Sequence, residues 1–154
     1  MNFKKPEIGI GTTAIVILAA IGIMLLTNGQ VKEADSEDSI NNQQLEAVIA
    51  EQLEKGLATI ADVAPERLAV AYEPVWAIGT GKVAGPEEIV EAHAIVRAKL
   101  LDILKEKANS TRVLYGGSVK PENASQIIVL DNVDGVLVGG ASLKAESFSK
   151  IVTA

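Results

Sequence analysis

The chain contains no cysteine and only one histidine, His93, among its 154 residues. The absence of thiols excludes disulfides, thiolate nucleophiles and thiolate metal sites. A zinc or non-haem iron site built on imidazoles needs at least two histidines, so the sequence gives no support for a metal centre. We therefore expect a protein whose chemistry uses neither a metal nor a thiol.

Basic residues are also scarce. Lysine and arginine together number 14 against 20 acidic residues, which gives a formal net charge of -6 and a pI near 4.8. Affinity for a phosphate backbone needs clustered lysine and arginine, so a nucleic-acid partner is excluded. With 48% hydrophobic and 22% charged residues, the composition is that of a globular protein of one ordinary domain.

The one long apolar stretch without charge is residues 8–26. A helix of this length spans about 28 Å, close to the hydrocarbon thickness of about 30 Å, and the run exceeds the usual core of a secretory signal. It follows a short basic N-terminus, residues 1–7, and no Ala-x-Ala cleavage site follows it. We predict a transmembrane helix over residues 8–26; the alternative is an apolar helix buried in the domain, although the run has no polar face.

Residues 27–44 are rich in Asn, Gln, Ser, Asp and Glu, so a polar linker is predicted there. The remaining segment, residues 45–154, starts with apolar residues at steps of three and four. This spacing predicts a helix that ends near Ala61, with the buried side Leu45, Val48, Ile49, Leu53, Leu57 and Ile60.

After this helix the pattern alternates between strands and helices. Short apolar runs predict strands at Leu68–Tyr72, Arg112–Tyr115 and Gly135–Val138, and prolines 86 and 121 open helices after the first two. A terminal helix is predicted from about Leu143 to Val152. Strands that alternate with helices over such distances indicate parallel pairing, so the predicted class is α/β.

A carboxylate follows the first of these strands. Ligands bind at the carboxyl ends of the strands in parallel α/β folds. Glu73, directly after Tyr72, would be rigidly placed and partly desolvated there, which suits a general base because burial raises the pKa of a carboxyl group. Position alone slightly favours the alternative, a solvated glutamate of a loop.

Paired glycines follow the other two strands. Gly116-Gly117, with Ser118, and Gly139-Gly140 would let backbone N–H groups approach a phosphate, although such pairs are more often tight turns. The segment Gly79-Thr-Gly-Lys82 is not a nucleotide loop, because Trp76 stands where its first glycine belongs and Val83 replaces the serine or threonine.

Three stretches resemble triosephosphate isomerase. Ala71-Tyr-Glu-Pro-Val-Trp-Ala-Ile-Gly-Thr-Gly-Lys82 is similar to the strand end and lid of that family at essentially every position. Tyr115-Gly-Gly-Ser-Val119 and Asp134-Gly-Val-Leu-Val-Gly-Gly-Ala-Ser142 resemble its two phosphate-binding stretches, in the same order. The resemblance covers about 110 residues and implies a partial (β/α)8 barrel of about three strand-helix units.

The resemblance implies a role for each matching residue. Glu73 would be the general base, which moves a proton between two carbons of the triose through an enediolate. The phosphate grip would use Gly79, Ser118, Gly139 and Gly140. The lid over the ligand would comprise Pro74, Val75, Trp76, Ala77, Ile78, Thr80, Gly81 and Lys82. The implied substrate is a triose phosphate, with no cofactor.

The sequence also departs from the family. The asparagine and lysine that follow the family's first strand, and the histidine after its fourth, have no counterpart here, and His93 resembles a packing residue of the helix after the lid. We therefore expect turnover only if a second chain supplies the missing strands. The alternative is a non-catalytic remnant, anchored in a membrane, that at most binds phosphate. Family resemblance implies a cytoplasmic location, and an anchor over residues 8–26 would imply a membrane-associated one.

Overall fold

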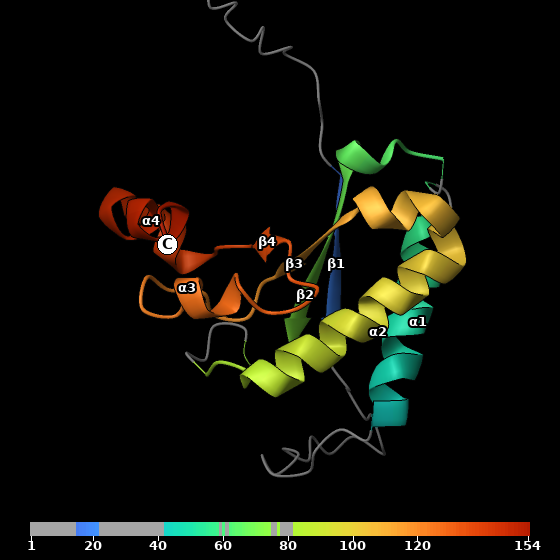
Figure 1. The fold of residues 1–154 in the computed structure, drawn as a ribbon, viewed down its shortest axis with the longest axis horizontal. Helices are drawn as coiled ribbons and strands as arrows, with labels where there is room; N and C mark the ends of the chain where they lie inside the picture. Colours follow the sequence, from blue (N-terminus) through green and yellow to red (C-terminus); the bar gives the residue numbers. More distant parts are fainter. Residues whose placement is uncertain (1–14, 22–41, 59, 61, 75–76, 78–81) are drawn as a thin grey trace, which may run out of the picture.

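The computed structural model describes residues 15–21, 42–58, 60, 62–74, 77 and 82–154 (Figure 1). Strands and helices alternate along these residues. Short 3-10 segments lie at η1 (Pro65–Arg67), η3 (Lys105–Ser110) and η4 (Gly140–Leu143). The main elements are β1 (Ile15–Ile21), α1 (Asn42–Leu57), β2 (Leu68–Pro74), α2 (Pro86–Leu104), β3 (Arg112–Tyr115), α3 (Ala124–Ile127), β4 (Gly135–Val136) and α4 (Ala145–Val152).

The described strands form one parallel sheet in the order β1-β2-β3-β4. Ile15 is opposite Leu68 at the first strand pair, and Ala69 is opposite Arg112 at the second. Because the spatial order follows the chain order, α1, α2 and α3 each lie in a crossover between neighbouring parallel strands, and α4 follows the last of them. The predicted α/β class with parallel strands is confirmed, with four strands in place of the predicted three.

The additional strand, β1, corrects the prediction of a transmembrane helix over residues 8–26. Residues 15–21 pair along their whole length with β2, from Ile15 opposite Leu68 to Ile21 opposite Pro74. A strand of a parallel sheet that is covered on both faces also has a continuous apolar sequence, so the lack of charge fits both structures. Among the described residues, no helix combines the length and the apolar character needed to cross a membrane. The rest of that predicted helix, and most of the predicted linker, lie outside the described residues.

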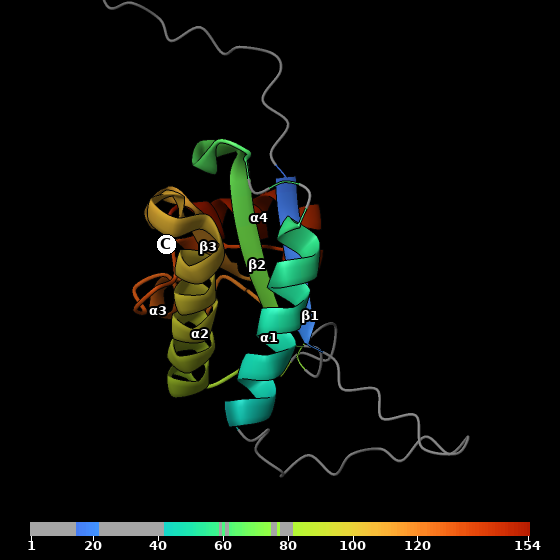
Figure 2. The same ribbon diagram turned by 90° about the vertical axis from the view of Figure 1, so that its right-hand side faces the viewer.

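Helices α1 and α2 lie side by side over one face of the sheet (Figure 2). Their apolar faces meet alternate residues of the strands, because successive side chains of a strand point to opposite faces. The two helices contribute apolar residues to the resulting core, and for α1 the helical spacing predicted this buried side. Strands β2 and β3 contribute Leu68, Val70, Tyr72, Val113 and Tyr115. Each fully buried Leu or Ile there stabilises the fold by about 1.5–3 kcal/mol relative to an exposed one.

Several boundaries differ from the predicted ones. Helix α1 begins inside the predicted linker and ends at Leu57, and β4 contains only Gly135 and Val136. The helix predicted after Pro121 is reduced to α3, and the C-terminal helical region is split into η4 and α4. Boundaries of this kind depend on which backbone groups find partners, which spacing alone does not specify.

Candidate functional site

Glu73 lies in β2, one residue before its end, and not in the loop after the strand as the sequence predicted. Leu68, Val70 and Tyr72 of the same strand belong to the core under the helices. By alternation, Glu73 lies on the opposite face of the sheet, together with Ala69 and Ala71. Its side chain is partly buried, and this burial raises the pKa of the carboxyl group. A carboxylate with a raised pKa is a better acceptor for a proton from carbon than a solvated one.

Gly116 packs directly against Glu73. A Cβ built on Gly116 would lie 2.5 Å from Cγ and 2.6 Å from Oε1 of Glu73, so no larger residue fits without a shift. The amide of Gly116 donates a hydrogen bond of 2.9 Å to the carbonyl of Tyr72, which fixes this approach. The loop after β3 is therefore held against the carboxylate at the end of β2.

Ser118 connects the same loop to the predicted lid. Its hydroxyl donates a hydrogen bond of 2.7 Å to the carbonyl of Ala77, which is fully buried. Ser118 has a positive φ of 56°, and its own carbonyl accepts a hydrogen bond of 3.2 Å from the Asn123 side chain. Asn123 also accepts one of 2.8 Å from the amide of Lys120, so the loop is held from both sides.

Tyr115 holds the chain beyond the other end of the lid. Its hydroxyl accepts a hydrogen bond of 3.3 Å from the amide of Ala84, and a Cβ on Gly117 would lie only 2.3 Å from that oxygen. Burial raises the pKa of the Tyr115 phenol. Sequence reasoning gave Tyr115 no role, although it opens the Tyr-Gly-Gly-Ser motif; its place at a strand end was the available signal.

Gly139 and Gly140 follow β4. They lie at the carboxyl ends of the strands, as Glu73 and Ser118 do, because all four strands are parallel. Both glycines are exposed, and a Cβ at either would meet nothing within 4 Å. Ser142 closes the turn by donating to the carbonyl of Gly139 from its amide, at 2.9 Å, and from its hydroxyl, at 2.7 Å. This open backbone leaves room for an anion.

The remaining predicted site residues form part of the lid. Pro74 is the last residue of β2, Ala77 is buried, and Lys82 is exposed. The other predicted lid and phosphate-binding residues lie outside the described residues: Val75, Trp76, Ile78, Gly79, Thr80 and Gly81. In the part of the chain that the structure describes, no group of three His, Cys, Asp or Glu side chains is placed to hold a metal ion.

His93 is a core residue, as the resemblance implied. It is fully buried, and its ring makes an edge contact with Tyr72 at 5.8 Å between centroids and a tilted one with Tyr115 at 6.2 Å. Its Nδ1 lies 3.0 Å from the carbonyl of Asn132, which can only accept, so Nδ1 carries a proton. Nε2 is buried without a hydrogen-bond partner, and burial lowers the pKa of the ring.

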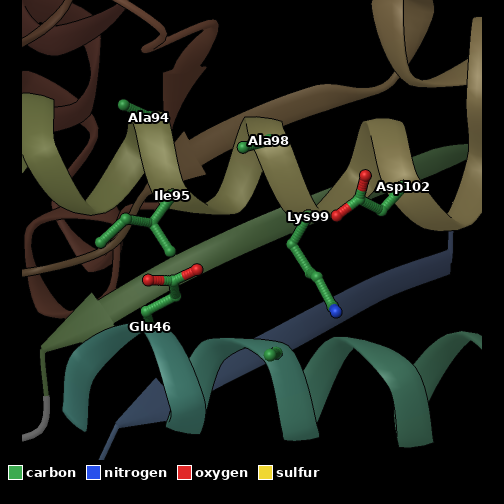
Figure 3. Close-up of a pocket in the computed structure, with 7 residues that line it drawn as sticks. Glu46, Ala94, Ile95, Ala98, Lys99 and Asp102 are labelled. Carbon is green, nitrogen blue, oxygen red and sulfur yellow. The ribbon is translucent and has the colours of Figure 1, made fainter. Parts of the chain in front are cut away.

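A separate groove of about 290 Å³ lies between α1 and α2, on the side of the helices away from the sheet (Figure 3). Alanines 50, 94 and 98 line it with Ile95, and Glu46, Lys99 and Asp102 border it. Lys99 forms an ion pair of 2.7 Å with Glu54 of α1. This groove contains none of the residues around Glu73, so the loops at the strand ends remain the candidate site.

Comparisons with known proteins agree with this geometry. A family model described as triosephosphate isomerase matches residues 31–154. A triosephosphate isomerase of Oleidesulfovibrio alaskensis is 66% identical over 112 residues, which are 72% of this chain and 45% of that protein. One of Nitratidesulfovibrio vulgaris (strain Miyazaki F) is 55% identical over 152 residues, which are 98% of this chain and 58% of that protein.

The fold gives the same result. The crystal structure of triosephosphate isomerase from Bartonella henselae superimposes with a TM-score of 0.61 at 37% identity, over 70% of this chain and 42% of that one. The chain spans about half the length of the curated relatives it matches.

Proposed function

Because the chain belongs to the triosephosphate isomerase family, we propose that it carries part of a site that interconverts dihydroxyacetone phosphate and glyceraldehyde 3-phosphate, in glycolysis and gluconeogenesis in the cytoplasm. The observation that supports this most directly is the contact between Glu73 and Gly116. It joins a partly buried carboxylate to the loop that also binds the lid through Ser118.

The reaction needs a base that takes a proton from one carbon and returns it to the next. The Glu73 carboxylate removes the proton from the carbon beside the carbonyl group, and the electron pair of that bond moves towards the carbonyl oxygen to give the enediolate. A proton must also pass from the hydroxyl group of the first carbon to the former carbonyl oxygen, and we assign this transfer to the second chain. Protonated Glu73 then returns its proton to the neighbouring carbon, so the base is regenerated. Partial burial of Glu73 favours this cycle because it raises the pKa of the carboxyl group towards the working pH.

The phosphate group of the substrate would bind between the loops after β3 and β4. Ser118, Gly139 and Gly140 are the described residues that we assign to this grip, and Gly79 of the lid would complete it. Closure of the lid, residues 74–82 with Ala84 behind it, would exclude water and protect the enediolate. The hydrogen bonds from Ser118 to Ala77 and from Ala84 to Tyr115 support this assignment, because they connect the lid to the phosphate-binding loop.

The chain lacks the family's lysine and histidine, which polarise the carbonyl group and neutralise the enediolate. Electrostatic stabilisation of this kind is usually the largest contribution to catalysis. We therefore propose that turnover requires a second chain that carries the missing strands. The absence of the family's lysine and histidine also favours a second candidate function, phosphate binding without turnover. A membrane anchor is not proposed, because residues 15–21 form β1.

The test is to assay isomerase activity of the purified chain alone and mixed with an N-terminal fragment of the Oleidesulfovibrio alaskensis relative that holds the missing strands. We expect activity in the mixture and none above background for the chain alone. Glu73→Gln should abolish the activity, whereas Glu106→Gln, at an exposed position of η3, should leave it unchanged. A mixture without activity would reject the enzymatic proposal, and binding of 2-phosphoglycolate would then support the phosphate-binding one.

A further inference from the structure

The sheet has two free edges among the described residues, at β1 and β4. These are opposite edges of a parallel sheet, so the outer edge of β4 can pair with the outer edge of a β1 in the same way as β2 pairs with β3. An exposed edge offers unpaired N–H and C=O groups to another chain. The two edges of this chain are therefore complementary to each other, but they lie on opposite sides of one sheet.

Exposed apolar side chains accompany the β4 edge. Leu143 in η4 is 87% exposed, and Phe148 and Val152 in α4 are 42% and 67% exposed. Phe148 and Val152 are four residues apart and share one face of α4, whereas Ile151 is buried against the rest of the molecule. We call Leu143, Phe148 and Val152 the C-terminal apolar strip. Figure 1 shows α4 on the β4 side of the sheet, away from α1 and α2. Three large exposed apolar side chains on two elements in contact, η4 and α4, favour an interaction surface here.

Closed parallel barrels contain eight strands, and the described residues of one copy provide four that follow each other in chain order. Two copies supply the complete number, and pairing β4 of each copy with β1 of the other leaves no free edge among these described strands. The arrangement has twofold symmetry, which is the commonest symmetry of soluble oligomers.

We propose that two copies of this chain associate edge to edge into a closed eight-stranded dimer, with the C-terminal apolar strip covering each junction. The same edges would receive a chain with the missing strands, so the two partners compete. The proposal depends on the strand edges and the apolar strip, and not on the isomerase reaction.

Sedimentation velocity over a range of concentrations tests the stoichiometry. The expected species has twice the chain mass of 16.1 kDa. The net charge of -6 on each copy opposes association, so the dimer should strengthen as salt rises towards 0.15 M, where the screening length falls to about 8 Å. A monomer at every concentration, or an open series of larger species, would overturn the proposal.

Substitution at the apolar strip tests the surface. Leu143→Glu and Phe148→Glu should each weaken the dimer by roughly tenfold or more, because a charge would then lie in the junction. Leu101→Glu is the matched control: Leu101 is 40% exposed but lies in α2, away from both edges. Equal weakening by the control would contradict the assignment. Circular dichroism of each variant separates loss of the dimer from loss of folding.

Disulfide trapping tests the pairing itself, and the chain suits it because it contains no cysteine. A variant with Val136→Cys in β4 is mixed in a thiol-disulfide buffer with variants that carry a single cysteine at positions 17–20 of β1. We expect cross-linked dimers in the mixtures at one or two β1 positions and none from either variant alone. Cross-linking of Val136→Cys with itself would show a β4–β4 contact and overturn the proposal.

The two proposals can fail separately. If the fragment with the missing strands restores activity and the chain alone stays monomeric, the dimer is wrong and the isomerase assignment holds. If the chain dimerises through β4 and β1 but no mixture is active, the dimer holds and the isomerase assignment is wrong. Dissociation of the dimer by added fragment would support the shared edges.

Discussion

At the scale of single residues, the site depends on a glycine that allows two strand ends to approach. Gly116→Ala would place a methyl group 2.5 Å from Cγ of Glu73, so the carboxylate or the loop must move. We expect a loss of about 1–3 kcal/mol in the free energy of unfolding, the usual cost of overpacking, measured by urea titration.

Gly140→Ala is the matched control, because a Cβ at Gly140 meets nothing within 4 Å. Its effect on the free energy of unfolding should stay within about 0.5 kcal/mol. Equal effects of the two substitutions would show that the close contact with Glu73 is not what restricts position 116.

His93 is expected to make stability depend on pH. Its pKa is lowered in the folded state by burial, so the unfolded chain binds more protons between that lowered value and about 6.5. The stabilisation by neutral His93 is complete above pH 6.5 and is lost as the pH falls through the lowered pKa. Urea titrations at pH 7.5 and 5.5 should therefore show a larger loss of stability for the wild type than for His93→Gln. An identical pH dependence in both proteins would contradict this account.

At the scale of the elements, Arg97 joins α2 to the chain on either side of β3. One guanidinium nitrogen donates to the carbonyls of Ala108, at 2.9 Å, and Thr111, at 2.7 Å, and the other pairs with Asp134. Asp134 also accepts a hydrogen bond of 2.7 Å from the amide of Val113 in β3. The start of β3 and the approach to β4 are thereby fixed to one helix.

Arg97→Met should lower the free energy of unfolding by about 1–3 kcal/mol, because it removes the side-chain donor of the Thr111 carbonyl and one of the two donors of the Ala108 carbonyl. Arg97→Lys should recover little of the lost stability, since one ammonium group cannot make the hydrogen bonds of both guanidinium nitrogens. Lys55→Met removes an exposed ion pair with Glu51 and should change stability by less than about 0.5 kcal/mol in chemical denaturation. A loss as small as that of Lys55→Met would reject the structural role of Arg97.

The elements also show how far the sequence predicts the fold. The start of α2 at Pro86 and the bounds of β3, Arg112–Tyr115, agree with the prediction because a proline, glycines and an apolar run mark them locally. Strand β1 was missed because its identity depends on pairing with β2, about fifty residues later, and an uncharged run fits a strand or a membrane helix.

For the candidate site, the resemblance identified Glu73 and Ser118, but not the contacts that assemble them. The hydrogen bond from Ser118 to Ala77 joins residues 41 positions apart, and the one from Ala84 to Tyr115 joins residues 31 apart. Local patterns carry no information about such pairs. The sequence therefore predicted roles for single residues. The contacts between the loops could be described only from the fold.

At the scale of the whole molecule, the described residues form an open four-stranded sheet that corresponds to part of the barrel of the family. Its carboxyl-end loops carry the groups that we assign to proton transfer and phosphate binding. The free edges of the described sheet, at β1 and β4, are the places where we propose that a partner pairs. The proposed dimer and the proposed complementation are two ways to satisfy the same edges.

The most direct test of the central claim, that Glu73 transfers the proton, is deuterium exchange in heavy water. Dihydroxyacetone phosphate is incubated with the chain and the fragment that holds the missing strands, and NMR measures deuterium at the carbon beside the carbonyl group. We predict incorporation with the wild-type chain and with Glu106→Gln, and none above buffer with Glu73→Gln. Incorporation at an unchanged rate in Glu73→Gln, or none with the wild-type mixture, would contradict the account.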